Sequence, residues 1–436
     1  MKKDCLKEKI KFFGSRTLLF LRWLLLAVIV GAVSGLLGTL FSKSISLVTE
    51  LRGEYQWLIF LLPVGGVVIA LLYKLLHVEG VGTNQAFEST RSDKKISPWL
   101  ALAIFVGSCI THLLGGSAGR EGAALQLGGS ISDFLSGVFR LDENTRRILT
   151  ICGMGAFFSA IFGTPLGAFI FAIEVVCVGK LCLTAIFPGF VSSLTAYFIA
   201  DLLGAEAERF PLAEVPDLAL DSLWKVLVVA GVGALISILF CHSLHFTEKI
   251  FKKWFKNVYL RAVVGGVLII GLTLLVGTDY NGGGIDVIMR VFESGDVRYE
   301  AFALKILFTV ITVAAGYKGG EIIPTLFIGA TFGGAFGTLL GLSPAFGAAV
   351  GMSALFCGVT NCPVATILLC IEMFGAEGSL FFALAAIISF LLSGNVSLYS
   401  SQQFAFSKWR NDNIIIGKEP IDERTVAFAN SSAESD

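Results

Sequence analysis

The sequence predicts an all-α membrane protein that crosses the bilayer several times through many short, tilted and broken helices. Three features of the chain predict this fold class. Its 436 residues are 55% hydrophobic and only 15% charged, and their mean hydropathy of +0.79 lies outside the range of soluble globular domains. One long stretch, residues 322–371, contains no Asp, Glu, Lys or Arg. Two parts of the chain also repeat each other.

The first apolar stretch runs from Thr17 to Phe41 and follows the Lys-rich residues 1–16. It is too long for the apolar part of a signal peptide and lacks a small-residue cleavage pattern, so we expect a retained first membrane helix. Basic residues beside a membrane helix usually stay in the cytoplasm, which predicts a cytoplasmic N-terminus. We expect Arg22, inside the stretch, to extend its charge toward the lipid headgroups.

The charge-free stretch is too long to form a single membrane helix. At 1.5 Å per residue, one helix over residues 322–371 would reach ~75 Å, whereas the hydrocarbon core of a bilayer is ~30 Å thick. The chain must therefore fold back on itself, and prolines and glycines mark the expected breaks. These are Pro324, the Gly333-Gly334 pair, Gly341, Pro344 and the Asn361-Cys362-Pro363 sequence.

Two segments align with each other without a gap. "GMGAFFSAIFGTPLGAFIFAIE", which ends at Glu174, matches "GMSALFCGVTNCPVATILLCIE", which ends at Glu372. Upstream, "GREGAALQLGG" has its counterpart 200 positions later in "GGEIIPTLFIGA", and "EGVGTN" more weakly matches "NGGGID". Duplicated halves of membrane transporters usually place the substrate site at their interface. We therefore predict a first membrane repeat at residues 17–203 and a second at 204–405.

Three glycine-rich breaks are the candidate binding elements. They are "GVGTN" at 80–84, "GREGA" at 119–123 and "GGEIIP" at 319–324. Each lies between apolar segments, which suits a helix that begins inside the membrane. The first turn of such a helix has free backbone N–H groups and the positive end of the helix dipole, so it favours an anion. A fourth candidate is Tyr399 in "SLYSSQ", whose hydroxyl could donate to an anion.

In this order and spacing, these motifs resemble those of the CLC family of chloride channels and proton-coupled halide antiporters. The signatures of that family are G-S-G-x-P, G-R-E-G-P, G-x-F-x-P and a tyrosine near the end of the last membrane helix. The resemblance covers roughly residues 17–405 and includes the internal duplication. It implies a CLC-type inverted-repeat fold, and a homodimer in which each subunit has its own halide pathway.

By this resemblance, Glu121 corresponds to the family's gating glutamate. The ionised carboxylate occupies an anion site and leaves it when protonated or displaced, which links anion occupancy to proton movement. The structural alternative is that Glu121 caps its helix or pairs with Arg120, for which we expect a supporting role. For Phe327, simple packing is the default interpretation, against a contact of its ring edge with the anion. The expected anion-binding positions are Val81, Gly82, Thr83, Asn84, Arg120, Gly122, Ala123, Glu321, Ile322, Ile323, Phe327 and Tyr399.

The chain also departs from the chloride-transporting members. Val81 stands where they carry a serine, and Glu321-Ile322-Ile323-Pro324 stands where G-x-F-x-P is expected. The G-G-E-x-x-P wording is similar to the fluoride-exporting branch, although that branch more often has Met at the position of Val81 and Thr at that of Ile323. The inner proton-transfer glutamate of chloride antiporters is replaced by Val175. These features favour proton-coupled fluoride export through Glu121 alone; the alternative is a passive or voltage-gated chloride channel.

Other classes of protein have weaker support in the sequence. An intramembrane hydrolase would need a nucleophile with a base, and only Ser117 and His112 come close together, without an evident supporting acid. A cation-coupled carrier of another fold would share the broken helices and repeats. His242 and His245 have no third ligand nearby, so we expect no metal site. No basic patch is visible, so we expect no nucleic-acid partner. We also expect no cofactor. Residues 406–436 are expected to form a short cytoplasmic tail.

Overall fold

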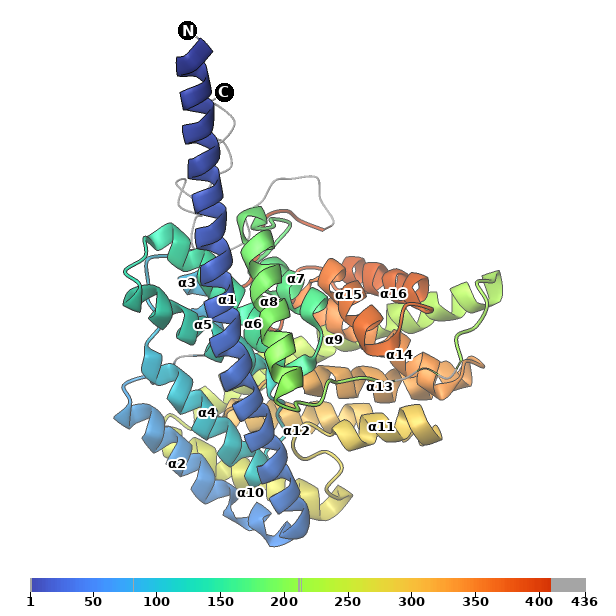
Figure 1. Cartoon of the computed structure of the whole chain (residues 1–436). Coiled ribbons are helices and arrows are strands. Elements are labelled where there is room, and N and C mark those ends of the chain that lie inside the picture. The colour runs from blue at the N-terminus through green and yellow to red at the C-terminus, as the bar shows by residue number, and fades with distance from the viewer. Residues whose placement is uncertain (1, 81, 211, 213, 409–436) are drawn as a thin grey trace.

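The computed structural model describes residues 2–80, 82–210, 212 and 214–408, with side chains from residue 16 onward (Figure 1). In the first half of this part, the elements are α1 (Lys2–Glu54), the 3₁₀ helix η1 (Gln56–Leu61), α2 (Leu62–Leu75), α3 (Thr83–Ser89), α4 (Pro98–Leu113), α5 (Glu121–Val138), α6 (Glu143–Phe162), α7 (Pro165–Glu174), β1 (Cys177–Val178), η2 (Leu183–Ala185) and α8 (Ile186–Leu202). The second half contains α9 (Leu220–Trp254), α10 (Val258–Val276), α11 (Ile285–Ser294), α12 (Ala301–Ala315), α13 (Ile322–Leu339), α14 (Pro344–Thr360), α15 (Pro363–Phe374), α16 (Ser379–Leu392) and β2 (Gln403–Phe404).

Helices of very different lengths make up this structure, and the chain is a multi-pass membrane protein. In the described residues, 7 helical segments are long and apolar enough to cross a membrane, and they include Arg16–Glu54 and Leu220–Trp254. Six further apolar helices have only 10–17 residues. The predicted fold class of short and broken membrane helices is therefore confirmed. The predicted first helix exists as well, but α1 extends beyond both predicted ends, and its N-terminal part projects beyond the other helices (Figure 1).

Most of the predicted breaks in the charge-free stretch fall between helices. The chain turns at Gly341, which has a positive φ of 79°, and again at Asn361, which has a φ of 59°. Pro344 and Pro363 begin the helices that follow these turns, where a missing N–H group costs no hydrogen bond. Pro324 lies in the first turn of α13, so the break that it predicts comes just before it.

The break predicted at Gly333 and Gly334 is wrong, because α13 continues through both residues. Gly333 serves instead to let α13 approach α14 closely, and Gly334 leaves room for Val291 of α11. A Cβ atom on Gly333 would lie 2.2 Å from the carbonyl oxygen of Gly347. A pair of glycines in an apolar stretch is equally compatible with a break and with close helix packing, and here packing prevails.

Two duplicated glutamates link the two halves of the chain by capping each other's helices. The carboxylate of Glu174, the last residue of α7, accepts hydrogen bonds from the N–H groups of Val364 and Ala365 at 3.3 and 2.8 Å, in the first turn of α15. The carboxylate of Glu372 in α15 accepts from Leu166 and Gly167 at 2.9 and 2.8 Å, in the first turn of α7. Carboxylates at helix N-termini are favoured by the free N–H groups and the dipole.

Candidate functional site

Two of the predicted breaks meet directly. The N–H group of Gly119 donates to the carbonyl oxygen of Gly320 at 2.6 Å, and the N–H group of Gly320 donates to that of Gly119 at the same distance. This reciprocal pair holds the start of α5 against the start of α13. Both helices therefore present their first turns, with the free N–H groups of these turns, at one point inside the protein.

Glu121 begins α5, but its carboxylate reaches across to α13. Its Oε2 atom accepts a hydrogen bond of 3.3 Å from the N–H group of Ile323, and the side chain is 0% exposed. A Cβ atom on Gly119 would lie 2.5 Å from Oε2, so the glycine leaves room for the carboxylate. The carboxylate thus occupies a helix N-terminus that would otherwise suit an anion.

Arg120 makes its main contacts away from Glu121. Its Nη1 atom donates to Ser42 Oγ on α1 at 2.7 Å, and its Nη2 atom forms an ion pair with Glu208 in the connection after α8. Its Nε atom lies 3.7 Å from Glu121 Oε1. These contacts agree with a supporting role for Arg120 rather than simple pairing with its neighbour.

A cavity of about 860 Å³ leads to Glu121 from the side of the molecule where α1 ends. Its walls include residues of α1, α4, the connection after α8 and the loop before α11. Among the lining side chains are Arg52, His112, Arg120, Glu121, Glu208 and Ile323. Glu121 therefore lies at the wall of a cavity on this side, although its own side chain is buried.

The remaining predicted positions lie either at the starts of α5 and α13 or near the start of α3. Gly122 and Ala123 are buried in the first turn of α5, and Ile322 and Ile323 are buried in the first turn of α13. Glu321 precedes α13, and its Oε2 atom lies 3.2 Å from the position that a Cβ atom on Gly122 would occupy. Each half of the chain therefore places a carboxylate beside the start of the other half's helix.

The first break, "GVGTN", lies at the start of α3. Gly82 precedes the helix and has an extended backbone, Thr83 Oγ1 accepts a 2.8 Å hydrogen bond from Gln126 Nε2 of α5, and Val81 lies outside the described residues. The side chain of Asn84 binds the chain after Tyr399 instead, because its Nδ2 atom donates to Ser400 Oγ at 2.9 Å and its Oδ1 atom accepts from the N–H group of Ser401 at 3.0 Å.

Tyr399 is buried beside α3, with 4% of its surface exposed. Its ring packs edge-on against the ring of Phe87, with 5.0 Å between the centroids. Within the described residues its hydroxyl has no hydrogen-bond partner. A buried hydroxyl without a partner is unfavourable, and an anion would relieve this cost.

The structure favours the packing interpretation of Phe327. Its ring is fully buried and lies 4.9 Å from the Nζ atom of Lys305, on α12. That ammonium group donates to the carbonyl oxygens of Tyr280 and Gly282 at 3.1 and 2.7 Å. The cation therefore interacts with the negative face of the ring. We did not predict Lys305 from the sequence, although a single lysine in an otherwise apolar helix was a usable signal.

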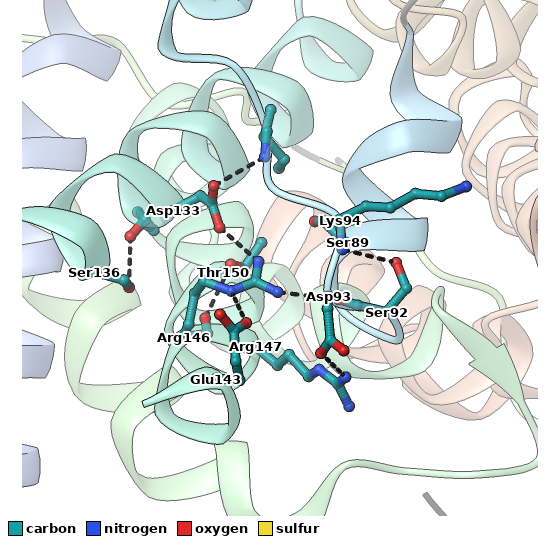
Figure 2. A network of polar contacts seen from close by, with 12 residues as sticks. Ser89, Ser92, Asp93, Lys94, Asp133, Ser136, Glu143, Arg146, Arg147 and Thr150 are labelled. Carbon is teal, nitrogen blue, oxygen red and sulfur yellow. Dashed lines mark hydrogen bonds and ion pairs between the residues drawn. The ribbon is translucent and has the colours of Figure 1, made fainter. Parts of the chain in front are cut away.

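A buried ion-pair network anchors the connection between α3 and α4 (Figure 2). Arg146 of α6 donates from Nη1 to Asp133 Oδ1 at 2.6 Å and from Nη2 to the carbonyl oxygen of Ser92 at 3.0 Å. Asp133 Oδ2 accepts from the N–H group of Ile96 at 2.9 Å. The network ties this connection to α5 and α6, and so fixes the place of the first break relative to Glu121.

The two residues considered for hydrolase chemistry bind other partners. Ser117 Oγ lies 3.1 Å from Thr309 Oγ1, and His112 Nδ1 contacts the carbonyl oxygen of Ser108 at 2.8 Å. Among the described side chains, no hydrogen bond joins Ser117 to His112. The geometry therefore gives no support to a nucleophile activated by this histidine.

Comparison with known proteins identifies the family of the chain. Over 396 residues it is 34% identical to a chloride/fluoride channel protein of Pseudomonas syringae pv. tomato, covering 89% of this chain and 87% of that protein. It is 27% identical over 384 residues to the H(+)/Cl(-) exchange transporter ClcA of Vibrio cholerae, covering 80% of this chain and 81% of the transporter.

Solved structures give the same result. A crystal structure of a CLC-type fluoride/proton antiporter matches with a TM-score of 0.85 and 30% identity, covering 88% of this chain and 98% of that one. A slow cyanobacterial Cl-/H+ antiporter shares the fold with a TM-score of 0.76 and 22% identity, over 95% and 99% of the two chains. The family model for the voltage gated chloride channel matches residues 65–394. The chain therefore belongs to the CLC family of voltage gated chloride channels.

Proposed function

We propose that this protein transports halide anions across a membrane and that its reaction is the export of fluoride in exchange for protons. The observation that carries this proposal is the carboxylate of Glu121, which reaches from α5 to the N–H group of Ile323 at the start of α13. The similarity to a chloride/fluoride channel protein and to a fluoride/proton antiporter supports fluoride as the substrate, as does the "GGEIIP" sequence before α13.

In the proposed mechanism, the carboxylate and the anion compete for one place. The ionised Glu121 takes up the free N–H groups at the start of α13, as an anion would. Protonation removes its charge, so its attraction to the helix start falls and an anion replaces it. The anion is then stabilised by the N–H groups near Gly82, Gly122 and Ile323 and by the hydroxyl of Tyr399, with Glu321 and Ala123 beside the path.

The residues at the family's inner proton-transfer position support proton exchange through Glu121 alone. Val175 is fully buried and has no titratable group. Its neighbour Glu174 uses both carboxylate oxygens to bind the start of α15. Neither side chain is therefore available to carry protons inward, which is why we assign proton exchange to Glu121.

We further propose that residues 17–203 and 204–405 are two inverted repeats. The pairing of Gly119 with Gly320 and the reciprocal caps of Glu174 and Glu372 support this division, because each contact joins corresponding regions of the duplication. The Lys-rich N-terminus supports an orientation with both termini in the cytoplasm. The cavity that leads to Glu121 then opens to the outside, and the protein functions as a homodimer in the cell membrane.

Transport in liposomes tests the proposal. Purified protein would be reconstituted, and fluoride and chloride efflux would be measured separately under an imposed pH gradient, with simultaneous recording of proton movement. We expect fluoride efflux to be accompanied by opposite proton movement, and Glu121→Gln to pass anions without protons. Proton-coupled flux that is unchanged in Glu121→Gln would contradict the mechanism. Chloride efflux without proton movement in the unmodified protein would indicate a passive channel.

A further inference from the structure

Arg120 and Glu121 are adjacent and buried, yet they form only a long ion pair and no hydrogen bond. The Nε atom of Arg120 and the Oε1 atom of Glu121 lie 3.7 Å apart, and their side chains are 11% and 0% exposed. Among the described residues, neither atom has any hydrogen-bond partner. Buried arginine and carboxylate groups normally form short, often bidentate pairs. Some other contact must therefore hold the guanidinium group in place.

Glu208 provides that contact. It forms an ion pair with Nη2 of Arg120, and the side chains of the two residues are 8% and 11% exposed. Ser42 accepts from Nη1 at 2.7 Å. The guanidinium group is thus bound at both terminal nitrogens, and only its Nε atom faces Glu121.

The backbone around Glu208 is fixed on both sides. The N–H group of Glu208 donates to the carbonyl oxygen of Phe162 at the end of α6 at 3.0 Å. Two residues later, the N–H group of Phe210 donates to Met373 of α15 at 3.0 Å, and the Phe210 ring is buried. The carboxylate therefore sits on a rigid part of the connection after α8 and can hold Arg120 in one orientation.

We infer that Glu208 is a positioning residue that holds Arg120 away from Glu121 and so leaves the Glu121 carboxylate free to exchange with an anion. This inference rests on the proposed gating role of Glu121. The ion pair with Glu208 balances the charge of Arg120. Without that balance, Arg120 would attract the ionised carboxylate of Glu121, keep it at the start of α13 and oppose its protonation.

Other charged and titratable groups also surround Glu121. Arg52 of α1 and His112 of α4 line the same cavity, Lys305 of α12 lies near His112, and Glu321 lies across the paired loops. Tyr399 lies close enough to Glu121 and Glu321 to interact with their charges. These groups are the same in the parent protein and in a Glu208 variant. The carboxylate of Glu208 also repels that of Glu121 directly, and Ser42→Ala, which changes no charge, isolates the contact with Arg120.

The test compares pH profiles of proton-coupled fluoride efflux from liposomes. In Glu208→Gln, we expect the pH of half-maximal flux to fall by about one unit, because the uncompensated arginine disfavours protonation of Glu121. Glu208→Asp keeps the charge and should restore the profile of the parent protein. Glu206→Gln is the matched control, because it removes a negative charge from an exposed residue of the same cavity wall, two positions away.

Two further comparisons test the inference, one with Ser42→Ala and one in the Glu121→Gln protein. Ser42→Ala removes the other ligand of Arg120 and should shift the profile in the same direction by a smaller amount. In Glu121→Gln, which should lack proton coupling, adding Glu208→Gln should change nothing. If Glu208→Gln and Ser42→Ala retain the profile of the parent protein, or if Glu206→Gln shifts it equally, the inference is overturned. Proton coupling that survives in Glu121→Gln would instead overturn the proposed function.

Discussion

Gly119 and Gly320 form two mutual backbone hydrogen bonds of 2.6 Å, although they lie 201 positions apart in the chain. Because each glycine lies two residues before the first residue of a helix, this pair sets the distance between the two helix N-termini. The carboxylate of Glu121 reaches Ile323 only because the loops are in contact. The pairing therefore positions the proposed anion site.

Substitution of Gly320 should disrupt this arrangement. A Cβ atom there would lie 2.2 Å from the N atom of Gly122, which is backbone and cannot rotate away. We expect Gly320→Ala to reduce fluoride efflux at least tenfold, because the helix starts must move apart. Gly137→Ala in α5 is the control, since a Cβ atom at Gly137 meets nothing within 4 Å. Normal efflux in Gly320→Ala would show that the close approach is not required for transport.

The reciprocal caps should stabilise the protein without carrying protons. Glu174→Gln replaces a charged acceptor of two backbone N–H groups by a neutral one, and we expect it to lower the free energy of unfolding by about 1–3 kcal/mol. Glu372→Gln should have a similar effect at the start of α7. Thermal unfolding in detergent measures both changes.

Proton-to-fluoride stoichiometry provides the second readout for the caps. It should be unchanged in Glu174→Gln if Glu174 has only a structural role. Loss of proton movement in this variant, with unchanged thermal stability, would instead identify Glu174 as part of an inner proton route.

The N-cap of α6 should make the stability of the protein depend on pH, independently of transport. Thr145 donates to Asp142 from its hydroxyl and from its backbone N–H group at 2.7 and 3.1 Å. These hydrogen bonds lower the pKa of Asp142 from its usual value. A carboxyl group whose pKa is lower in the folded state stabilises the protein above its unfolded pKa, and this stabilisation is lost as the pH falls through the folded pKa.

Asp142→Ala should therefore lower the melting temperature at neutral pH. In acid, the difference in melting temperature between the variant and the parent protein should become smaller. Loss of an N-cap typically costs about 0.5–2 kcal/mol. Melting curves of both proteins between neutral pH and about pH 3, the range of an aspartate pKa, measure the difference. An equal difference in melting temperature at all pH values would show that the ionised carboxylate is not the stabilising species.

The sequence predicted the elements of the site better than the contacts between them. The motif around Glu121 and the later motif around Glu321 were recognisable because residue type and spacing carry the helix-start signal. Glu208 was missed, since it lies in a polar connection and its role depends on a tertiary contact with Arg120. Gly333 was misassigned because the need for close packing against Gly347 depends on a partner helix that the local sequence does not reveal.

Asn84 shows the same limit within a recognised motif. Its place in "GVGTN" predicted a contact with the anion, but its side chain binds Ser400 and Ser401. This contact fixes the position of the neighbouring Tyr399 relative to α3. Spacing along the chain predicted a helix start at this segment, which the structure has, but could not say which partners its side chains would bind.

The buried hydroxyl of Tyr399 should contribute to anion binding more than to stability. Because it has no hydrogen-bond partner among the described residues, Tyr399→Phe removes no contact within the protein and should leave thermal stability unchanged or slightly higher. It should weaken fluoride binding by about 1.5–3 kcal/mol, the range for a hydrogen bond to a charged group. Titration calorimetry on purified protein measures this loss of affinity.

Tyr73→Phe is the matched control for this prediction. The hydroxyl of Tyr73 is likewise buried and has no partner in the described part of the chain, but its ring packs against Lys318, with Nζ 4.3 Å from the centroid, and lies outside the proposed anion-binding set. Fluoride affinity should therefore be retained in Tyr73→Phe and reduced in Tyr399→Phe. Equal affinities in the two variants would mean that Tyr399 packs against Phe87 without contacting the anion, and the site would then consist of the helix starts alone.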